Sequence, residues 1–118
     1  MVAYFYVFLT IVLTVYGQLM IKARATALAR VAEGREFLVA MFLDPWVLSG
    51  LAAALAASAT WMLAVRTANL SAIYPIMALT FVIIPILAVV AFGEKLAPMQ
   101  IVGIALIVLG VALSARAS

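Results

Sequence analysis

Four polar side chains recur at every fourth residue of the first apolar stretch: Thr10, Thr14, Gln18 and Lys22. In an α-helix such side chains lie on one face, and at ~1.5 Å per residue the line would be about 18 Å long. It would lead from the mid-membrane region to the membrane edge, where the cation lies. Neutral hydrogen-bonding groups in this order predict a substrate-facing line that holds a polar group within a membrane.

Each of the four residues also has a structural explanation. A Thr hydroxyl can donate to the carbonyl four residues earlier in its own helix, and a Gln amide can bond a neighbouring helix. A Lys near a helix end commonly extends its ammonium group to the membrane surface. The structural and the substrate-binding interpretations both remain open at this point.

The elements that position this line follow from the composition. The chain has 118 residues, of which 70% are apolar and 9% charged, and its mean hydropathy is +1.36, which excludes an ordinary soluble domain. Most charges lie between residues 22 and 44. Four uncharged runs remain, each about 20 residues long and thus able to cross ~30 Å of hydrocarbon: 2–21, 46–65, 70–92 and 97–115. We expect an all-α integral membrane bundle of four transmembrane helices, in one domain (1–118) with a charged loop at 22–44.

Several functional classes are excluded by residues that are missing. The chain has no His and no Cys, which excludes zinc sites built on those ligands, thiolate nucleophiles, imidazole bases, haem and iron–sulfur ligation. We therefore expect no cofactor, no metal and no enzymatic activity. The sequence has no Gly-rich phosphate loop and its net charge of +3 lies in loops, so no nucleic-acid partner is expected.

Charge placement also predicts how the chain enters the membrane. The first run lacks a preceding Lys or Arg and exceeds the about 7 to 15 apolar residues of a signal peptide, so we expect it to stay in the mature protein. Loops after the first and third spans carry five Lys and Arg residues and the opposite side carries two. This bias favours those loops in the cytoplasm and both termini outside.

Local signals refine the first two spans. The segment 23–32 is rich in helix-favouring residues, so the first helix is expected to project beyond the bilayer before Gly34 interrupts it. Asp44 and Pro45 are typical of the cap and first turn of a helix. Many small residues in the second span predict close backbone approach, which makes it the expected packed, central helix.

Two prolines interrupt the third span and two glycines mark the fourth. Pro75 and Pro85 each remove an amide donor, which indicates either a simple kink or a hinge beside a substrate path. Gly103 and Gly110 offer a close-contact seam between chains, or else pack within the monomer. Because four short helices enclose little space, we expect a homodimer or a heterodimer with a related small subunit.

The order and spacing of several motifs resemble the drug/metabolite transporter superfamily over nearly the whole chain. The motifs are Gly17-Gln18-Leu19 followed by Lys22, Ser71-Ala-Ile-Tyr74-Pro75, Phe92-Gly93-Glu94-Lys95-Leu96, and Gln100 with Gly103-Ile-Ala-Leu-Ile-Val-Leu-Gly110-Val111.

Two small branches of that superfamily are similar to the chain. The small multidrug resistance family is similar at Gly17, Lys22, Tyr74 and the 103–111 stretch, which in that family packs the fourth helices of an antiparallel dimer. The essential glutamate in the first helix of that family would fall at Thr14 of this chain. The tryptophan that the family has three residues after the tyrosine is replaced here by Met77. These departures argue against proton-coupled drug export.

The other branch comprises the EamA-like subunits of the aminoarabinose-phosphoundecaprenol flippase, which also lack that glutamate. They resemble the chain at Gly17-Gln18-Leu19, Lys22 and Tyr74-Pro75. This resemblance implies a flippase for an undecaprenyl-phosphate-linked sugar in the bacterial inner membrane. We also expect Trp61 and Tyr74 to join the four-residue line as substrate-binding residues.

Two other functions stay open. One is an exporter of small cations or metabolites, although no span holds the ionisable group that such a carrier normally needs. The other is a non-transporting assembly subunit whose polar line contacts another membrane protein.

Overall fold

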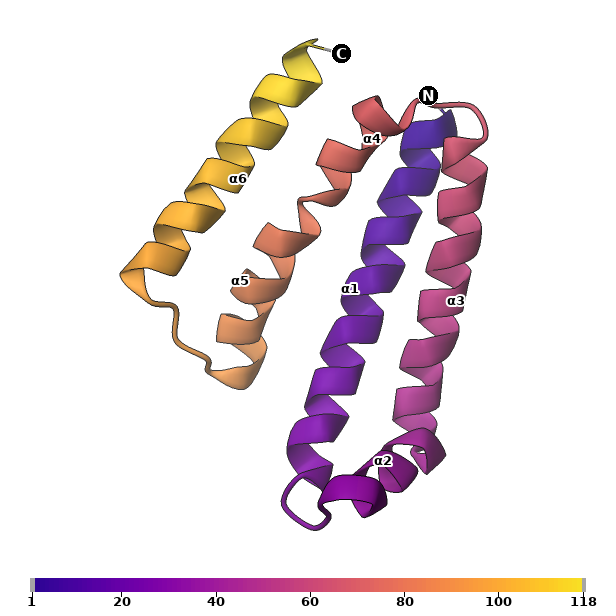
Figure 1. Cartoon of the computed structure of the whole chain (residues 1–118), viewed down its shortest axis with the longest axis vertical. Coiled ribbons are helices and arrows are strands. Elements are labelled where there is room, and N and C mark those ends of the chain that lie inside the picture. The colour runs from indigo at the N-terminus through magenta and orange to yellow at the C-terminus, as the bar shows by residue number, and fades with distance from the viewer. Residues whose placement is uncertain (1, 118) are drawn as a thin grey trace.

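The structure is a computed structural model that describes residues 2–117, and its regular elements there are all helices. They are α1 (Val2–Leu28), α2 (Gly34–Leu43), α3 (Pro45–Val65), α4 (Leu70–Met77), α5 (Thr80–Phe92) and α6 (Pro98–Ala117). Four segments are long and apolar enough to cross a membrane: α1, α3, α4 with α5, and α6. This confirms the predicted all-α, four-span membrane bundle. The start of α1 and the end of α6 lie at one end of the bundle and α2 at the other (Figure 1).

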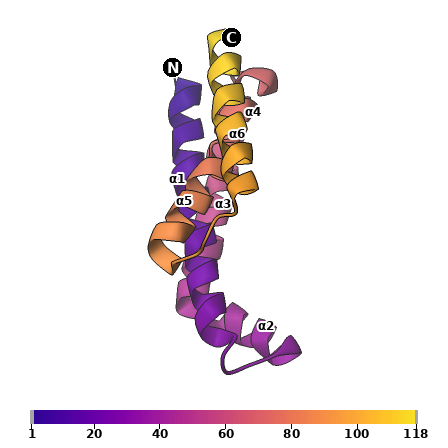
Figure 2. The ribbon, with the colours of Figure 1, turned by 90° about the vertical axis from the view of Figure 1, so that its left-hand side faces the viewer.

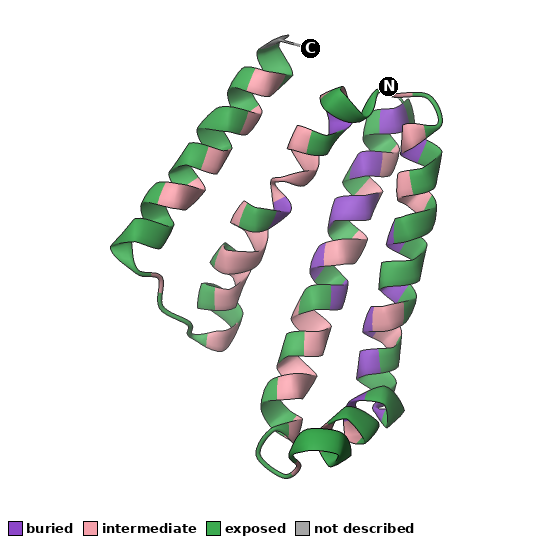
Figure 3. Ribbon diagram, viewed as in Figure 1, coloured by how far each residue is buried: buried purple, intermediate pink, exposed green. Residues whose placement is uncertain are grey.

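The first helix, α1, is the centre of the bundle. It packs against α2, α3, α4 and α5, whereas α6 packs against α4 and α5. Buried residues gather where α1 and α3 face each other, and none of the described residues of α6 is buried (Figure 3). The second span, α3, is well packed as expected, but the expectation that it is central was wrong. Small residues bring one neighbour close to α3; they do not determine how many neighbours it has.

The contact between α1 and α3 depends on glycines at the crossing. A Cβ atom added at Gly17 would lie 2.9 Å from the carbonyl oxygen of Gly50, and one added at Gly50 would lie 3.2 Å from that of Gly17. Ala53, Ala57 and Ala64 are buried along the same helix, α3. Small side chains therefore allow the two backbones to touch, and van der Waals contact replaces the hydrophobic effect that is missing in lipid.

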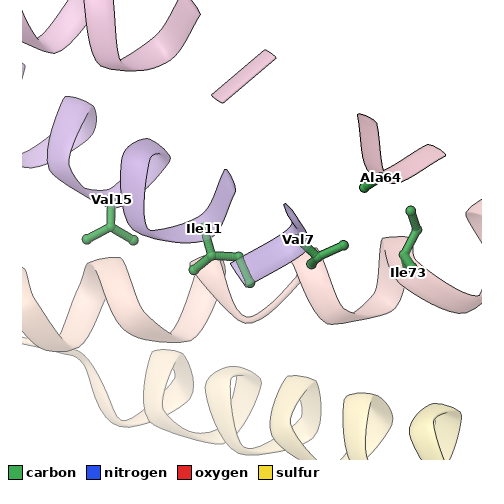
Figure 4. Close-up of a cluster of buried hydrophobic side chains, with 5 residues drawn as sticks. All are labelled: Val7, Ile11, Val15, Ala64 and Ile73. Carbon is green, nitrogen blue, oxygen red and sulfur yellow. The ribbon is translucent and has the colours of Figure 1, made fainter. Parts of the chain in front are cut away.

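A hydrophobic cluster holds the termini-side half of the bundle together. Val7, Ile11 and Val15 of α1 meet Ala64 of α3 and Ile73 of α4 (Figure 4). Ile73 and Val7 are almost completely buried. This cluster fixes α4 against the α1–α3 pair and thereby places the broken third span beside the polar line of α1.

The segment 22–44 is mostly helical rather than a charged loop. As expected, α1 projects past the apolar run, and it ends at Leu28. Gly34 takes a left-handed φ of 57° and begins α2, which projects sideways at the end of the bundle (Figure 2). Met41 is the buried residue of α2. Burial of this apolar side chain against the spans, which charge counting overlooks, explains the extra helix.

Asp44 caps α3, as the sequence predicts. Its Oδ1 accepts hydrogen bonds from the backbone N–H groups of Trp46 and Val47, and its Oδ2 accepts one from Nε of Arg24 at 2.9 Å. Burial raises the pKa of Asp44, but the bonds from Arg24, Trp46 and Val47 and the charge of Arg24 outweigh it. The net pKa lies below the usual value of 3.8.

The low pKa predicts acid-sensitive stability. A carboxyl group whose pKa is lowered by folding stabilises the protein fully above the unfolded pKa and loses this contribution as the pH falls toward the folded one. We expect Asp44→Asn to lower the thermal midpoint at neutral pH. The difference in thermal midpoint between this variant and the wild type should shrink as the pH falls below 3.8. Thermal unfolding in detergent from pH 7 to pH 2 measures both effects. Glu36→Gln, at an exposed acid of α2, is the control. If the two thermal midpoints differed as much at pH 2 as at pH 7, this explanation would be wrong.

The third span is interrupted at Ala78 and Leu79, between the two expected hinge residues. Pro75 lies inside α4 and Pro85 inside α5. The N–H groups of Ala78 and Leu79 donate to carbonyls three residues earlier, and the hydroxyl of Thr80 donates to the Met77 carbonyl at 2.9 Å. This hydroxyl supplies a donor where the regular backbone bonding changes, so the break is tolerated at membrane depth.

Candidate functional site

A cleft of about 370 Å³ lies between three of the four spans. It is lined by α1 residues Thr10, Thr14, Gly17, Gln18 and Ile21; by α3 residues Gly50, Ala54, Ala57, Ser58 and Trp61; and by Tyr74, Met77, Ala78, Thr80 and Phe81 of the broken span. Since α1 packs against both α3 and α4–α5, it forms the floor of the cleft and they form its walls. This volume falls within the about 300–1,000 Å³ that is typical of small-molecule sites.

Two polar side chains that α1 contributes to the lining are free to bind a ligand. Within residues 2–117, the hydroxyl of Thr14 and the amide of Gln18 have no hydrogen-bond partner. Both lie on the face of α1 that forms the floor. A polar group at membrane depth without a protein partner requires water or a substrate, so these two residues are the best candidates for ligand contact.

The hydroxyls of Thr10, Ser58 and Thr80 in the lining are occupied within the protein. Thr10 donates to the Tyr6 carbonyl at 2.8 Å, and its Oγ1 lies 2.6 Å from that of Thr60. Ser58 donates to the Ala54 carbonyl at 3.2 Å. Thr10 is also buried, with 3% of its surface exposed. Thr10 therefore has the structural role that was one of its two interpretations: its hydroxyl links α1 to α3.

Aromatic side chains form the end of the cleft nearer the chain termini. The rings of Trp61 and Tyr74 meet edge to face across α3 and α4, with centroids 5.8 Å apart. Phe81 also lines the cleft, and Tyr74 and Phe81 are largely exposed. Aromatic faces at an open cleft can pack against a flat ring or a cation.

The lining carries no formal charge. None of the described lining residues is Asp, Glu, Lys or Arg. Lys22, expected at the mouth of the line, is not part of the lining, and its Nζ lies 3.7 Å from Oε2 of Glu94. About half of each of these side chains is exposed. The charged end of the line is thus an ion pair beside the cleft.

The structure brings five of the six expected substrate-binding residues to the cleft: Thr10, Thr14, Gln18, Trp61 and Tyr74. The expected packing residues lie elsewhere. A Cβ atom added at Gly103 or Gly110 would meet nothing within 4 Å.

Sequence reasoning missed the other lining residues, among them Ser58, Thr80 and Phe81. Of these residues, Thr80 could have been recognised from the sequence, because a hydroxyl between two prolines of one span can donate to a carbonyl that lacks its backbone partner.

Comparison with known proteins gave one match. A model of the EamA-like transporter family matches residues 26–116. Neither the curated proteins nor the solved structures gave a match.

Proposed function

This chain belongs to the EamA-like transporter family, and on that premise we propose that it flips an undecaprenyl-phosphate-linked sugar across the bacterial inner membrane. The observation that carries the proposal is the chemistry of the cleft. Thr14 and Gln18 offer unpaired hydrogen-bonding groups, Trp61 and Tyr74 offer aromatic surface, and the described lining holds no acidic or basic side chain.

A sugar ring matches this lining on both of its surfaces. Its hydroxyl rim can exchange hydrogen bonds with the Thr14 hydroxyl and the Gln18 amide. Its C–H face can pack on Trp61 or Tyr74, whose rings have apolar faces. A neutral site does not discriminate by charge, so hydrogen bonding and shape would select the head group.

The size and the openness of the cleft suit a substrate with a lipid tail. A space of about 370 Å³ holds a head group but no long polyprenyl chain, so the tail has to stay in the bilayer. Gln18, Ser58, Tyr74 and Phe81 line the cleft and are exposed, so the site is open rather than enclosed. A head group could then move along the cleft while its tail remains in hydrocarbon, where no desolvation is needed.

The proposed substrate is tested by native mass spectrometry of the purified chain and by translocation in vesicles. We expect bound undecaprenyl-phosphate-linked sugar, and faster transfer of its head group across vesicles that contain the protein than across empty ones. Equal transfer in both kinds of vesicle would contradict the proposal.

The aromatic end of the cleft supports a second candidate, an exporter of small organic cations. Trp61, Tyr74 and Phe81 line one region, and a cation over aromatic faces is attracted without any acidic group. This function would give cells resistance to quaternary ammonium compounds and would give vesicles uptake that responds to a pH gradient. Absence of both responses would leave the flippase as the better candidate.

We propose further that the working unit is a dimer, of this chain with itself or with a related small subunit, formed through α6. In support, none of the described residues of α6 is buried, and the space beside Gly103 and Gly110 is open. The glycines would allow a second helix to approach closely.

Cysteine cross-linking tests the self-paired form of this dimer, because the chain has no cysteine of its own. Ile107 lies between the two glycines on their face of α6, and Leu109 lies on another face. We expect Ile107→Cys to form disulfide-linked dimers in membranes and Leu109→Cys to remain monomeric. Equal cross-linking of both variants would contradict a seam at these glycines, and no cross-linking of either would contradict self-pairing through α6.

A further inference from the structure

An ion pair joins α1 to the connection between α5 and α6. Nζ of Lys22 lies 3.7 Å from Oε2 of Glu94. Gly93 ends α5 in a left-handed conformation, with φ of 68°, and the Glu94 N–H donates to the Ala88 carbonyl at 3.4 Å. This connection lies toward the end of the bundle that carries α2 (Figure 1). The backbone thus keeps residue 94 beside α1, within reach of Lys22.

The pair lies one helical turn beyond the free amide of the cleft. Lys22 follows Gln18 by four residues on the same face of α1, and Ile21, next to Lys22, lines the cleft. One turn of helix is ~5.4 Å long. A head group that bonds Gln18 would therefore bring a phosphate attached to it within reach of the Lys22 ammonium group.

Resting on the proposed function, we propose that the Glu94 carboxylate occupies the phosphate position at Lys22 and that substrate binds there by displacing it. Exposed ion pairs at such distances contribute little stability, because water screens both charges. The phosphate that links a sugar to a polyprenol is a diester, which has one negative charge and two terminal oxygens, as the Glu94 carboxylate does, so it can accept the same charge-assisted hydrogen bonds from Lys22. The exchange keeps one anion at Lys22, and the hydrogen bonds of the head group to Gln18 in the cleft favour the substrate, whereas a neutral lipid alcohol cannot replace Glu94.

This competition makes Glu94 a specificity-determining residue. With Glu94 in place, the Lys22 charge is neutralised, so a ligand gains from that charge only if it outcompetes the carboxylate. Weak anions would not displace the carboxylate and neutral lipids would gain nothing from Lys22, while a polyprenyl phosphate would be accepted. Removing the carboxylate should strengthen phosphate binding, and it should do so only while Lys22 is present.

Binding of undecaprenyl phosphate to the full chain in nanodiscs tests the proposal, with undecaprenol as the neutral probe. We expect Glu94→Gln to raise the affinity for undecaprenyl phosphate about two- to fivefold, the range expected for release of an exposed ion pair. We expect Lys22→Gln to lower it roughly tenfold, as for loss of a charge-assisted hydrogen bond. Adding Glu94→Gln to Lys22→Gln should change nothing. Undecaprenol should bind all four proteins equally.

A matched control is Glu36→Gln, which removes an exposed acid from α2, a helix that follows the same end of α1. It should leave the affinity at the wild-type value. The proposal is overturned if Glu94→Gln does not raise the affinity, if Glu36→Gln raises it equally, or if the rise persists without Lys22. Absence of undecaprenyl phosphate binding to every variant would overturn this proposal, whereas the proposed substrate is decided separately by mass spectrometry of the purified chain with the sugar-linked lipid. The predicted Glu94 response without head-group translocation would support this proposal and contradict the flippase function alone.

Discussion

Replacing Gln18 with Leu is expected to lower head-group translocation at least ~10-fold while the protein remains folded and inserted. The Gln18 amide lines the cleft and has no hydrogen-bond partner within residues 2–117, so its removal costs no protein contact. Leu has a similar size but cannot bond a sugar hydroxyl. The rate of transfer in vesicles at equal protein content measures the effect, and thermal unfolding in detergent checks the fold.

The control for this variant is Tyr16→Phe on the same helix. The Tyr16 hydroxyl lies 3.0 Å from Oγ of Ser49 and is not part of the cleft lining. Its loss also removes a polar group from α1, but away from the proposed path. If Gln18→Leu translocated the head group at the wild-type rate, or if Tyr16→Phe lost as much activity, the Gln18 amide would not be a substrate contact.

The largest effect on stability is expected for Gly17→Ala. The added Cβ atom would lie 2.9 Å from the Gly50 carbonyl oxygen, a backbone atom that cannot move without shifting the whole of α3. Overpacking of this kind costs about 1–3 kcal/mol, which exceeds the gain of about 0.5–1 kcal/mol when Ala replaces Gly in a helix. We expect a net loss of free energy of unfolding, measured by denaturant titration of the monomer in mixed micelles.

Two other glycines give this prediction its internal comparison. Gly50→Ala should destabilise less, because its Cβ atom would lie 3.2 Å from the nearest atom, the Gly17 carbonyl oxygen. Gly103→Ala in α6 should be neutral or slightly stabilising in the monomer, because its Cβ atom would meet nothing within 4 Å. If all three substitutions had the same effect, close approach at the α1–α3 crossing would not explain the stability of the bundle.

The architecture was predictable because one physical constraint dominates it. Charges are expensive in hydrocarbon, so uncharged runs of sufficient length mark the four spans. The four-residue spacing of Thr10, Thr14 and Gln18 likewise places them on one face of α1 in any helical fold. Local signals also sufficed at Asp44, where a carboxylate before Pro45 caps the next helix.

Features that depend on contacts between distant segments were not predictable. Lys22 was expected at the mouth of the polar line, but its ion pair was not foreseen, because Glu94 is 72 positions away in the chain and only the fold brings the two together. Helix α2 could not be recognised from charge counts, because it is short and the burial of Met41 depends on its neighbours. Pro75 and Pro85 indicated a break in the third span, but the bonding of Thr80 helps to determine where it lies.

The most direct test of the central claim is head-group translocation after the cleft has been filled. Ala54 lines the cleft and Ala56 is exposed on another face of the same helix, so Ala54→Trp and Ala56→Trp add equal bulk at different places. If the head group moves through the cleft, Ala54→Trp stops its transfer across vesicles and Ala56→Trp transfers it at the wild-type rate. Equal transfer by the two variants, at equal amounts of folded protein, would contradict the claim that the cleft is the path.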